Sequence, residues 1–548
     1  MRWRYVQGQA PLLSPSAWSK LLFSFFPLVM ACGSSAPPDG SNQNHEDSSL
    51  DASPTDSSLD ALDSSIDSPT DASNMAQDGF VPNDAPSSDL VEVSHPREMR
   101  GVWVATVFNL DFPSRSGLAP NAAREELEQI VERVARTGLN AIFFQVRPES
   151  DALYASTIEP WSRFLSGTQG RDPGYDPLAI LIELAHARGI EVHAWLNPYR
   201  GLANASTPTA PNHPTRTLSA HAIRYDSMVI MDPGAEAVRN HVRMVIEDIA
   251  SRYDIDGIHF DDYFYPYPDS SRTPFPDDAS YNAYLASGGT LSRSDWRREN
   301  VNALIRGVYE DLRRNHPDVR FGVSPFGIYR PGMPPGIRGL DAYETIYCDA
   351  PRWLRENWLD YLAPQLYWPT TQTAQAFEPL ARWWSERADI HENLFIGHAL
   401  HRLGSSPAWT VAEIETQVRI VREIGTSSPL KGSLFFRYRQ IAQNTLGITN
   451  AMERLYSRPA LPPPIPRLSS TRVSPPIVER EGRSIRLSHP TPRGLRAYTL
   501  YRRTSGQWVL VRIIPPTERT ITLEAGEWAL ASVLKGAIES QGVRIVLE

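Results

Sequence analysis

The chain has 548 residues, which is too long for one ordinary domain and predicts about two or three. Its formal net charge of −9 excludes the strongly basic face of a nucleic-acid-binding protein, so we expect no nucleic-acid partner. The 14 Trp and 21 Tyr fit either large cores or platforms for carbohydrate, and composition alone does not separate the two.

The first residues have the pattern of an export signal. Basic residues precede the apolar run 21–31, which is too short to span a membrane and is typical of a signal-peptide core. Cys32 ends this run, as in a bacterial lipoprotein cleavage site, and Gly33 rather than Asp follows it. We predict a signal peptide over 1–31 and lipidation of Cys32. The protein would then be an exported lipoprotein. The lipid on Cys32 would anchor it in the outer membrane or at the cell surface, where it would face the periplasm or the exterior. Plain secretion is the alternative.

Residues 32–94 are predicted to be a disordered tether that begins at the lipidated Cys32. Ser, Asp and Pro recur through this segment, and aromatic residues are almost lacking. Such a chain buries too little apolar surface to offset the entropy lost on ordering. Because Cys348 is the only other cysteine, we expect no intramolecular disulfide.

Short apolar runs alternate with longer amphipathic ones over residues 95–457. The predicted strands are 101–107, 141–146, 191–197, 257–261, 320–325, 361–367, 394–399 and 432–436. The predicted helices are 124–137, 177–188, 235–253, 296–315, 350–357, 374–387, 411–424 and 445–455. Eight β/α pairs in succession indicate an α/β fold, a (β/α)8 TIM barrel. A doubly wound open sheet is the alternative, but no glycine-rich phosphate loop follows the first strand.

The sequence pattern changes twice towards the end of the chain, first to a proline-rich segment and then to alternating apolar and polar residues. Residues 458–467 include Pro-Ala-Leu-Pro-Pro-Pro-Ile-Pro and are predicted to be a stiff polyproline linker. Residues 468–548 then alternate with a period of two, with strands at 484–487, 496–502, 508–513, 520–523, 528–532 and 544–547. We predict a small all-β sandwich similar to a fibronectin type III module. A structural role for it is favoured over glycan binding.

Polar and aromatic residues gather where the predicted barrel strands end. The carboxyl ends of the strands form the mouth of a TIM barrel, which is where its sites lie. Capping would explain a few such residues but not a ring of them, so we predict a cleft. Its substrate-binding candidates are Arg147, Glu149, Asp151, Asn197, Tyr199, His259, Tyr263, Gln365, Tyr367, Trp368 and His398.

Asp261 and Asp262 at the end of the fourth strand are the predicted catalytic centre. Side chains alternate along a strand, so Asp261 shares the inward face with His259, and Asp262 reaches the site because the strand ends there. Burial or a neighbouring carboxylate would raise the pKa of one of them, giving an acid near neutral pH. The residues do not tell which is the acid. Structural capping of the following turn is the alternative.

The second catalytic group is left open by the sequence. Glu149 and Asp151 follow strand two, and Asp341 and Glu344 follow strand five, whereas strand seven offers His398 and no carboxylate. An N-acetyl group of the substrate could serve as internal nucleophile, oriented by one Asp while the other protonates the leaving oxygen. This pattern favours an N-acetylated glycan as substrate.

Several linked motifs resemble the bacterial glycosyl-hydrolase-like family ten. They are Met99-Arg100-Gly101-Val102-Trp103-Val104, Phe144-Gln145-Val146-Arg147-Pro148, Pro160-Trp161-Ser162, His193-Ala194-Trp195-Leu196-Asn197-Pro198, Gly257-Ile258-His259-Phe260-Asp261-Asp262-Tyr263 and Pro364-Gln365-Leu366-Tyr367-Trp368. The resemblance covers roughly residues 95–455. It implies an exported or lipidated (β/α)8 barrel protein, in a family of which at least one branch is implied to cleave peptidoglycan strands stripped of their peptides. It also implies that sugar subsites are lined by Arg147, Asn197, Tyr199, Tyr263, Gln365 and Tyr367.

The sequence around the fourth predicted strand is also similar to the Asp-Gly-x-Asp-x-Asp-x-Glu pattern of chitinase-type barrels. Tyr263 stands where that pattern has its Glu acid, which argues against a chitinase. We predict a cell-envelope glycoside hydrolase that needs no cofactor or metal. One alternative is a catalytically inactive glycan-binding lipoprotein. Another is a metal-dependent polysaccharide deacetylase or hydrolase using His193, His259, Asp261 and His398, although no tight ligand spacing supports it.

Overall fold

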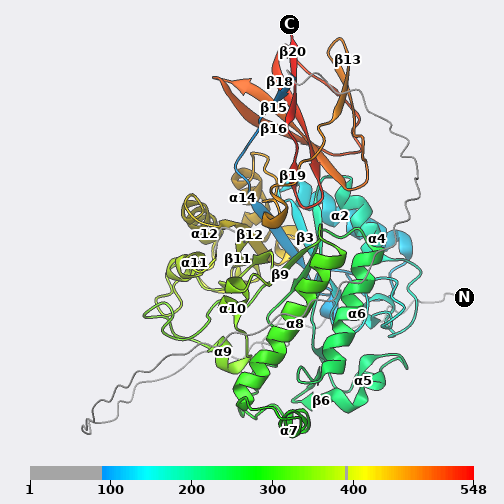
Figure 1. Ribbon diagram of the computed structural model, residues 1–548, viewed down its shortest axis with the longest axis vertical. Helices are drawn as coiled ribbons and strands as arrows, with labels where there is room; N and C mark the ends of the chain where they lie inside the picture. The colour runs from blue at the N-terminus through cyan, green and yellow to red at the C-terminus, as the bar shows by residue number, and fades with distance from the viewer. Residues whose placement is uncertain (1–88, 389–392) are drawn as a thin grey trace, which may run out of the picture. The chain divides into compact units, whose positions relative to one another are not determined.

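The computed structural model describes residues 89–388 and 393–548, so the predicted signal peptide, Cys32 and most of the predicted tether lie outside the described residues. Eight parallel strands close into a barrel, and the predicted (β/α)8 fold is confirmed (Figure 1). In barrel order the strands are β10 (Tyr361–Leu362), β11 (Asn393–Ala399), β12 (Leu430–Phe436), β2 (Met99–Val104), β3 (Ala141–Arg147), β4 (Glu191–Leu196), β8 (Gly257–Phe260) and β9 (Arg320–Val323).

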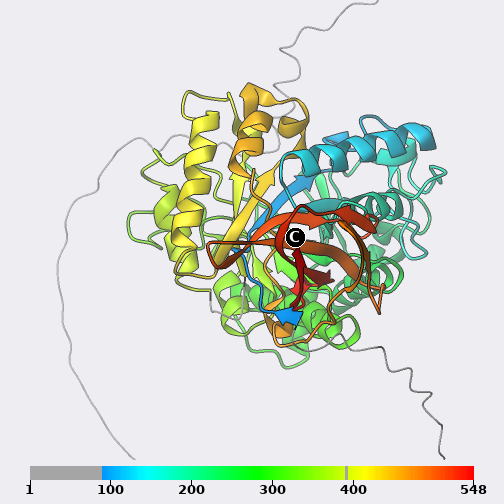
Figure 2. The same cartoon turned by 90° about the horizontal axis from the view of Figure 1, so that it is seen from above.

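Amphipathic helices surround the strands, and Figure 2 shows them in a ring at the periphery. They include α2 (Pro120–Arg136), α4 (Pro177–His186), α6 (Glu236–Arg252), α8 (Arg293–Asn315), α11 (Phe377–Ser385), α12 (Val411–Ile424) and α14 (Ile448–Leu455). Helix α2 buries Leu127, Ile130, Val131 and Val134 at helical spacing against the barrel. Burying each such side chain contributes about 1.5–3 kcal/mol. Among the described residues, no helix is long and apolar enough to cross a membrane.

Large rings fill the inside of the barrel. Phe143, Trp195, Tyr361, Phe395 and Leu434 belong to one buried cluster, contributed by strands all around the barrel. Gly322 leaves the space that the Tyr361 ring occupies, because a Cβ there would lie 2.1–2.4 Å from ring atoms. The interior is therefore a packed core and not a pore, as in other barrels of this fold.

Two insertions beside the mouth were not predicted. After β4, the strands β5 (Arg200–Leu202), β6 (Ala222–Tyr225) and β7 (Met228–Met231) form a small antiparallel sheet. After β8, the helix α7 (Asp278–Ala286) precedes α8. Elements this short leave too little periodicity in the sequence to be recognised.

The C-terminal region consists of antiparallel sheets, as expected for the predicted all-β module. One sheet has β13 (Ile477–Glu481), β14 (Ser484–Ser488) and β17 (Thr520–Thr522), and the other contains β15 (Leu495–Thr504), β16 (Gln507–Ile514), β18 (Gly526–Leu534) and β20 (Gly542–Leu547). The strand β1 (Leu90–Val91), from before the barrel, pairs with β20. The end of the predicted tether is thus part of this sheet. The likeness to a fibronectin type III module stays a prediction.

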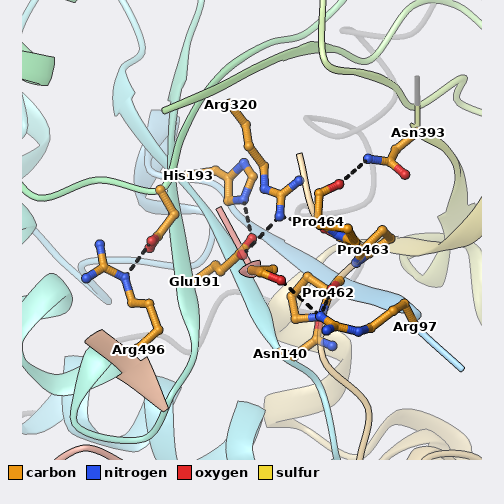
Figure 3. A network of polar contacts seen from close by, with 12 residues as sticks. Arg97, Asn140, Glu191, His193, Arg320, Asn393, Pro462, Pro463, Pro464 and Arg496 are labelled. Carbon is orange, nitrogen blue, oxygen red and sulfur yellow. Dashed lines mark hydrogen bonds and ion pairs between the residues drawn. The ribbon is translucent and has the colours of Figure 1, made fainter. Parts of the chain in front are cut away.

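The proline-rich linker is bound at the base of the barrel, where the strands begin, and is not a free spacer (Figure 3). Proline lacks an N–H but keeps its carbonyl, and successive linker carbonyls accept hydrogen bonds from side chains at the strand starts. Asn140 Nδ2 donates to Ala460 at 3.0 Å, Arg320 Nη2 to Pro463 at 2.6 Å, and Asn393 Nδ2 to Pro464 at 3.1 Å. The linker closes this end of the barrel.

The C-terminal module is joined to the barrel by charge as well. Arg496 of β15 donates to Asp256 at 2.7 Å and to Asp254 at 2.8 Å, both in the turn before β8. His186 lies 2.8 Å from Asp256 on the other side. These contacts make a buried ion pair between the two parts, which is costly to break from one side only.

Candidate active site

Asp261 and Asp262 lie at the carboxyl end of β8, where the strand stops and the chain turns. Because β8 runs parallel to β4 and β9, its end is at the same rim as theirs. The side chains of Asp261 and Asp262 are 5% and 4% exposed. Two carboxylates are therefore held in sequence at the mouth, nearly shielded from water.

Asp261 is fixed by three N–H donors. Trp195 Nε1 donates to Oδ2 at 3.1 Å, and the Asn197 amide donates to the same oxygen. The backbone N–H of Tyr263 donates to Oδ1 at 3.3 Å. The Asp261 side chain was predicted to point into the barrel. Its contact with Trp195, a side chain of the barrel interior, agrees with this.

The orientation of Asn197 follows from the contacts of its own oxygen. Gln145 Nε2 donates to Asn197 Oδ1 at 2.7 Å, and Arg200 Nη2 donates to it at 2.5 Å. Gln145 is in turn held by the backbone N–H groups of Thr106 and Val107, at 2.9 and 3.0 Å. Since both donors occupy the oxygen, the Asn197 nitrogen must face Asp261.

Asp262 has a different set of partners. The Tyr267 hydroxyl donates to its Oδ2. The Gln365 side-chain amide, which donates to the Ser324 carbonyl at 2.9 Å, is close enough to lower the pKa of Asp262. Gln365 follows β10, on the far side of β9 from β8, so two separate strand ends converge on this carboxylate. The predicted proximity of Gln365 to the aspartates is seen in the structure.

Burial gives the pair acid–base properties near neutral pH. Burial first, and then the Asp262 charge, raises the pKa of Asp261 to about 7, against the opposing Arg200 cation. Burial raises the pKa of Asp262 to about 6, although its hydrogen bonds to Tyr267 and Gln365 lower it in part. The pair can therefore hold one proton at neutral pH, which suits one group to donate a proton while the other is ionised.

A first aromatic wall stands beside Asp262. The Tyr263 and Tyr267 rings are 5.7 Å apart, Tyr267 and Phe326 are 6.3 Å apart, and Phe326 and Trp368 are 5.6 Å apart. All four side chains are only partly buried. Ring faces at an open mouth are the flat apolar platforms on which sugar rings stack.

A second aromatic wall consists of Trp103, Tyr367, His401 and Phe436. Phe436 lies 6.2 Å from Trp103 and 6.0 Å from Tyr367, and Tyr367 lies 5.3 Å from His401. Burial, and then the charge of Asp262, raises the pKa of the Tyr367 hydroxyl well above its usual value. Tyr367 therefore lies near Asp262.

His259 lies beneath the mouth in a column of hydrogen bonds. Trp103 Nε1 donates to His259 Nε2 at 3.0 Å, and His259 Nδ1 is 3.0 Å from the Tyr361 hydroxyl. That hydroxyl is 3.2 Å from His193 Nδ1, and His193 Nε2 is 3.2 Å from Glu191. Because Trp103 can only donate, a neutral His259 must carry its proton on Nδ1. The column orients Trp103 from below, and His259 is not itself open to substrate.

Three predicted substrate contacts after β3 are engaged elsewhere. Arg147 pairs with Glu159 through two hydrogen bonds, at 2.6 and 2.8 Å. Glu149 pairs with Arg163 at 3.1 Å, and Asp151 accepts from the Glu149 backbone N–H at 3.1 Å. All three predicted residues are 0–1% exposed, so they order the loops behind the mouth and do not meet a ligand.

Tyr199 and His398 were also predicted to contact substrate, and both predictions are wrong because the two side chains point away from the mouth. Tyr199 is fully buried in the core between strands and helices. His398 is buried outside the barrel, with Nδ1 2.9 Å from Gln417 and Nε2 2.9 Å from Ser433. His398 alternates away from the barrel interior on β11, whereas Tyr199 lies in the bend after β4 and turns into the outer core. Residue type alone reveals neither direction.

Other mouth residues were missed by the predicted site. They are Trp103, Gln145, Trp195, Arg200, Tyr267, Phe326, His401 and Phe436. Trp195 and Gln145 could have been found, because each lies on its strand at even spacing from an inward residue. Tyr267 lies in a loop whose path no periodicity predicts. In the described ranges, no three or more His, Cys, Asp or Glu side chains gather as a metal site.

The family described as Glycosyl hydrolase-like 10 matches residues 98–411. The chain belongs to this family. The resemblance predicted from the motifs is thereby confirmed, and membership of a glycosyl hydrolase-like family supports a glycoside hydrolase with a carbohydrate substrate.

Relatives of this glycosyl hydrolase-like protein include two bacterial proteins named as glycosyl hydrolases. YngK of Bacillus subtilis (strain 168) is 37% identical in an alignment 401 residues long, which covers 71% of this chain and 77% of YngK. DigH of Escherichia coli (strain K12) is 34% identical over 379 residues, 64% of this chain and 85% of DigH. Among solved structures, α-L-fucosidase isoenzyme 2 from Paenibacillus thiaminolyticus has a TM-score of 0.42 and 10% identity, over 66% of this chain and 49% of that one.

Proposed function

We propose that the protein is a cell-envelope glycoside hydrolase that cleaves O-glycosidic bonds of an N-acetylated polysaccharide by Asp-based acid–base catalysis. Peptide-free peptidoglycan strands are the favoured substrate. The observation that carries the proposal is the buried Asp261–Asp262 pair, with pKa values of about 7 and 6, between two aromatic walls. A proton donor beside an ionised carboxylate is what glycoside cleavage requires.

In the proposed reaction, the protonated aspartate donates its proton to the glycosidic oxygen as that bond breaks. The ionised aspartate hydrogen-bonds to the N–H of the sugar's N-acetyl group, whose carbonyl oxygen attacks the anomeric carbon. Water then opens the resulting ring, and the first aspartate, now ionised, takes its proton. This route needs no carboxylate nucleophile from the seventh strand, β11, whose His398 faces away from the barrel.

The decisive experiment measures new reducing ends released from peptide-free peptidoglycan strands. The wild type should release them, and Asp261→Asn and Asp262→Asn should each lower the rate by about 100-fold or more, as for loss of a general acid or base. Asp278→Asn is a matched control, because this exposed carboxylate is on α7 away from the pair. Equal rates in all four proteins would place catalysis elsewhere.

The same variants separate catalysis from binding alone, which the aromatic walls also favour. A catalytically inactive glycan-binding protein would retain strands on a column in all variants yet release no ends. The aspartate that acts as the acid is identified by substrates with a good leaving group, because they need no protonation. Only the variant lacking the acid should regain activity on them.

We also propose that the protein is exported and anchored through a lipid on Cys32, to the outer membrane or the cell surface. The support is the sequence pattern before Cys32. Labelling of cells with radioactive palmitate should mark the wild type and leave Cys32→Ser unlabelled. Labelling of both proteins, or of neither, would contradict lipidation at this residue.

A further inference from the structure

Arg437 directly follows β12 and lies at the mouth beside the second aromatic wall. Its neighbour Phe436 is part of that wall. The Arg437 cation is also close enough to His401 of the wall to contribute to the lowered pKa of that imidazole, after burial and Arg402. Arg437 itself is only 7% exposed. A buried guanidinium is thus placed at the rim where a sugar ring would stack.

The ionic partner of Arg437 does not satisfy its N–H donors. Asp111 Oδ1 is 3.5 Å from Arg437 Nη1, which is too long for a good hydrogen bond. Both Asp111 oxygens already accept from backbone N–H groups, Oδ2 from Ala105 at 2.8 Å and Oδ1 from Arg439 at 2.9 Å. Arg437 Nη1 is buried with no hydrogen-bond partner among the described residues. Asp111 therefore balances the charge of Arg437 and leaves donors available.

Two other arginines near the strand ends differ from Arg437 in this respect. Arg147 donates from all three of its nitrogens, to Glu159, Ser150 and two backbone carbonyls. Arg200 donates to Asn197 Oδ1 and to the Pro148 carbonyl. Buried donors in native proteins are nearly always satisfied, so the unsatisfied one on Arg437 indicates a place for an acceptor from outside the chain.

We propose that Arg437 binds a carboxylate of the substrate, specifically the 3-O-lactyl carboxylate of an N-acetylated sugar. A guanidinium presents parallel N–H donors that match a carboxylate in charge and geometry. In peptidoglycan the lactyl carboxyl carries the peptide as an amide and becomes an anion once the peptide is removed. Arg437 would then be the residue that selects peptide-free strands. This inference rests on the proposed function and names the determinant of its substrate class.

The test compares two soluble glycan substrates that differ only at the lactyl group. In one the carboxylate is free, and in the other it is converted to a neutral methylamide. For the wild type, kcat/KM should be about 10- to 100-fold higher on the free acid, the range for one charge-assisted hydrogen-bonded contact. Arg437→Gln should lose this preference by slowing on the free acid and changing about twofold or less on the amide.

Controls separate the guanidinium from charge and from folding. Arg437→Lys keeps the positive charge beside Asp111 and should show an intermediate preference, because it lacks the paired donors. Arg439→Gln removes a positive charge two residues away, on an exposed side chain, and should keep the full preference. Near-ultraviolet circular dichroism and the urea midpoint report whether each variant is folded.

Failure of this inference can be told from failure of the proposed function. If the wild type cleaves both substrates equally well, or if Arg437→Gln slows both equally, Arg437 does not bind the substrate carboxylate. If the wild type cleaves neither substrate, the hydrolase proposal has failed. Calorimetric binding of both oligomers to wild type and Arg437→Gln then decides whether Arg437 binds the lactyl carboxylate. Tighter binding of a uronic-acid oligomer than of the lactyl oligomer would show that the carboxylate comes from a different sugar.

Discussion

Removing the Tyr267 hydroxyl should shift the pH dependence of activity in a direction that the geometry fixes. This hydroxyl donates to Asp262 Oδ2 and so stabilises the ionised carboxylate. A hydrogen bond to a charged group contributes about 1.5–3 kcal/mol, and one pKa unit corresponds to about 1.4 kcal/mol. Tyr267→Phe should therefore raise the pKa of Asp262 from about 6 by about one to two units.

The assay is kcat/KM for strand cleavage between pH 4 and 10, for wild type and Tyr267→Phe. The limb governed by Asp262 should move to higher pH by about one to two units. If Asp262 acts ionised, its ionised fraction at pH 7 falls from about 0.9 to between about 0.5 and 0.1, and activity falls about two- to ninefold. Activity should not be restored at high pH, because Asp261, with a pKa of about 7, must still carry its proton to act as the acid. The maximum of the pH profile should therefore fall and move to higher pH.

A matched control is Tyr253→Phe, which removes a hydroxyl 2.6 Å from Asp176, at the N-terminus of α4 and outside the barrel. Its pH profile should match that of the wild type. An unmoved limb in Tyr267→Phe, or an equal shift in both variants, would refute the assignment of Asp262 to the titrating pair. A loss of activity that is constant at every pH would mean that the Tyr267 hydroxyl acts on the substrate and not on the pKa of Asp262.

Two further changes test the support around the site and the attachment of the C-terminal module. Asn197→Ala removes a donor to Asp261 and should lower kcat/KM about 10- to 100-fold. Because it also leaves buried donors of Gln145 and Arg200 without their acceptor, the free energy of unfolding in urea should fall by about 1–3 kcal/mol, and unchanged activity would contradict the role of Asn197. Arg496→Ala leaves Asp256 buried without its cation and should lower the free energy of unfolding in urea by about 3–5 kcal/mol. Because Arg496 and His186 hold the pKa of Asp256 well below its usual value, this stabilisation should be full above pH 4. It should decline as the pH falls through the lowered native pKa, and a pH-independent difference would contradict the pairing.

The barrel could be predicted from the sequence because each strand is a continuous apolar run followed by an amphipathic helix. The strand predicted at 257–261 and the observed β8 (Gly257–Phe260) differ by one residue. The inward direction of the Asp261 side chain could also be predicted, because side chains alternate along a strand and Asp261 lies two residues after His259. Local pattern is enough where a side chain's surroundings are set by its own strand.

What the sequence could not give depends on contacts between distant segments. Arg147 was assigned to the mouth because it ends a strand, but Glu159, twelve residues later, holds it in the loop behind. The proline-rich linker reads as a spacer, and only the side chains at the strand starts, such as Asn140 and Arg320, reveal that it is bound. Each case needs the position of a partner that no local periodicity encodes.

The pairing of β1 with β20 has a practical consequence for handling the enzyme. The first and last described segments of the chain are neighbours in one sheet, and this sheet packs on the linker that seals the starts of the barrel strands. The full length of the barrel separates them from Asp261 and Asp262. A dye or a solid support attached near residue 89 or at residue 548 should thus leave the barrel mouth uncovered. Orientation-controlled immobilisation therefore suits this protein well.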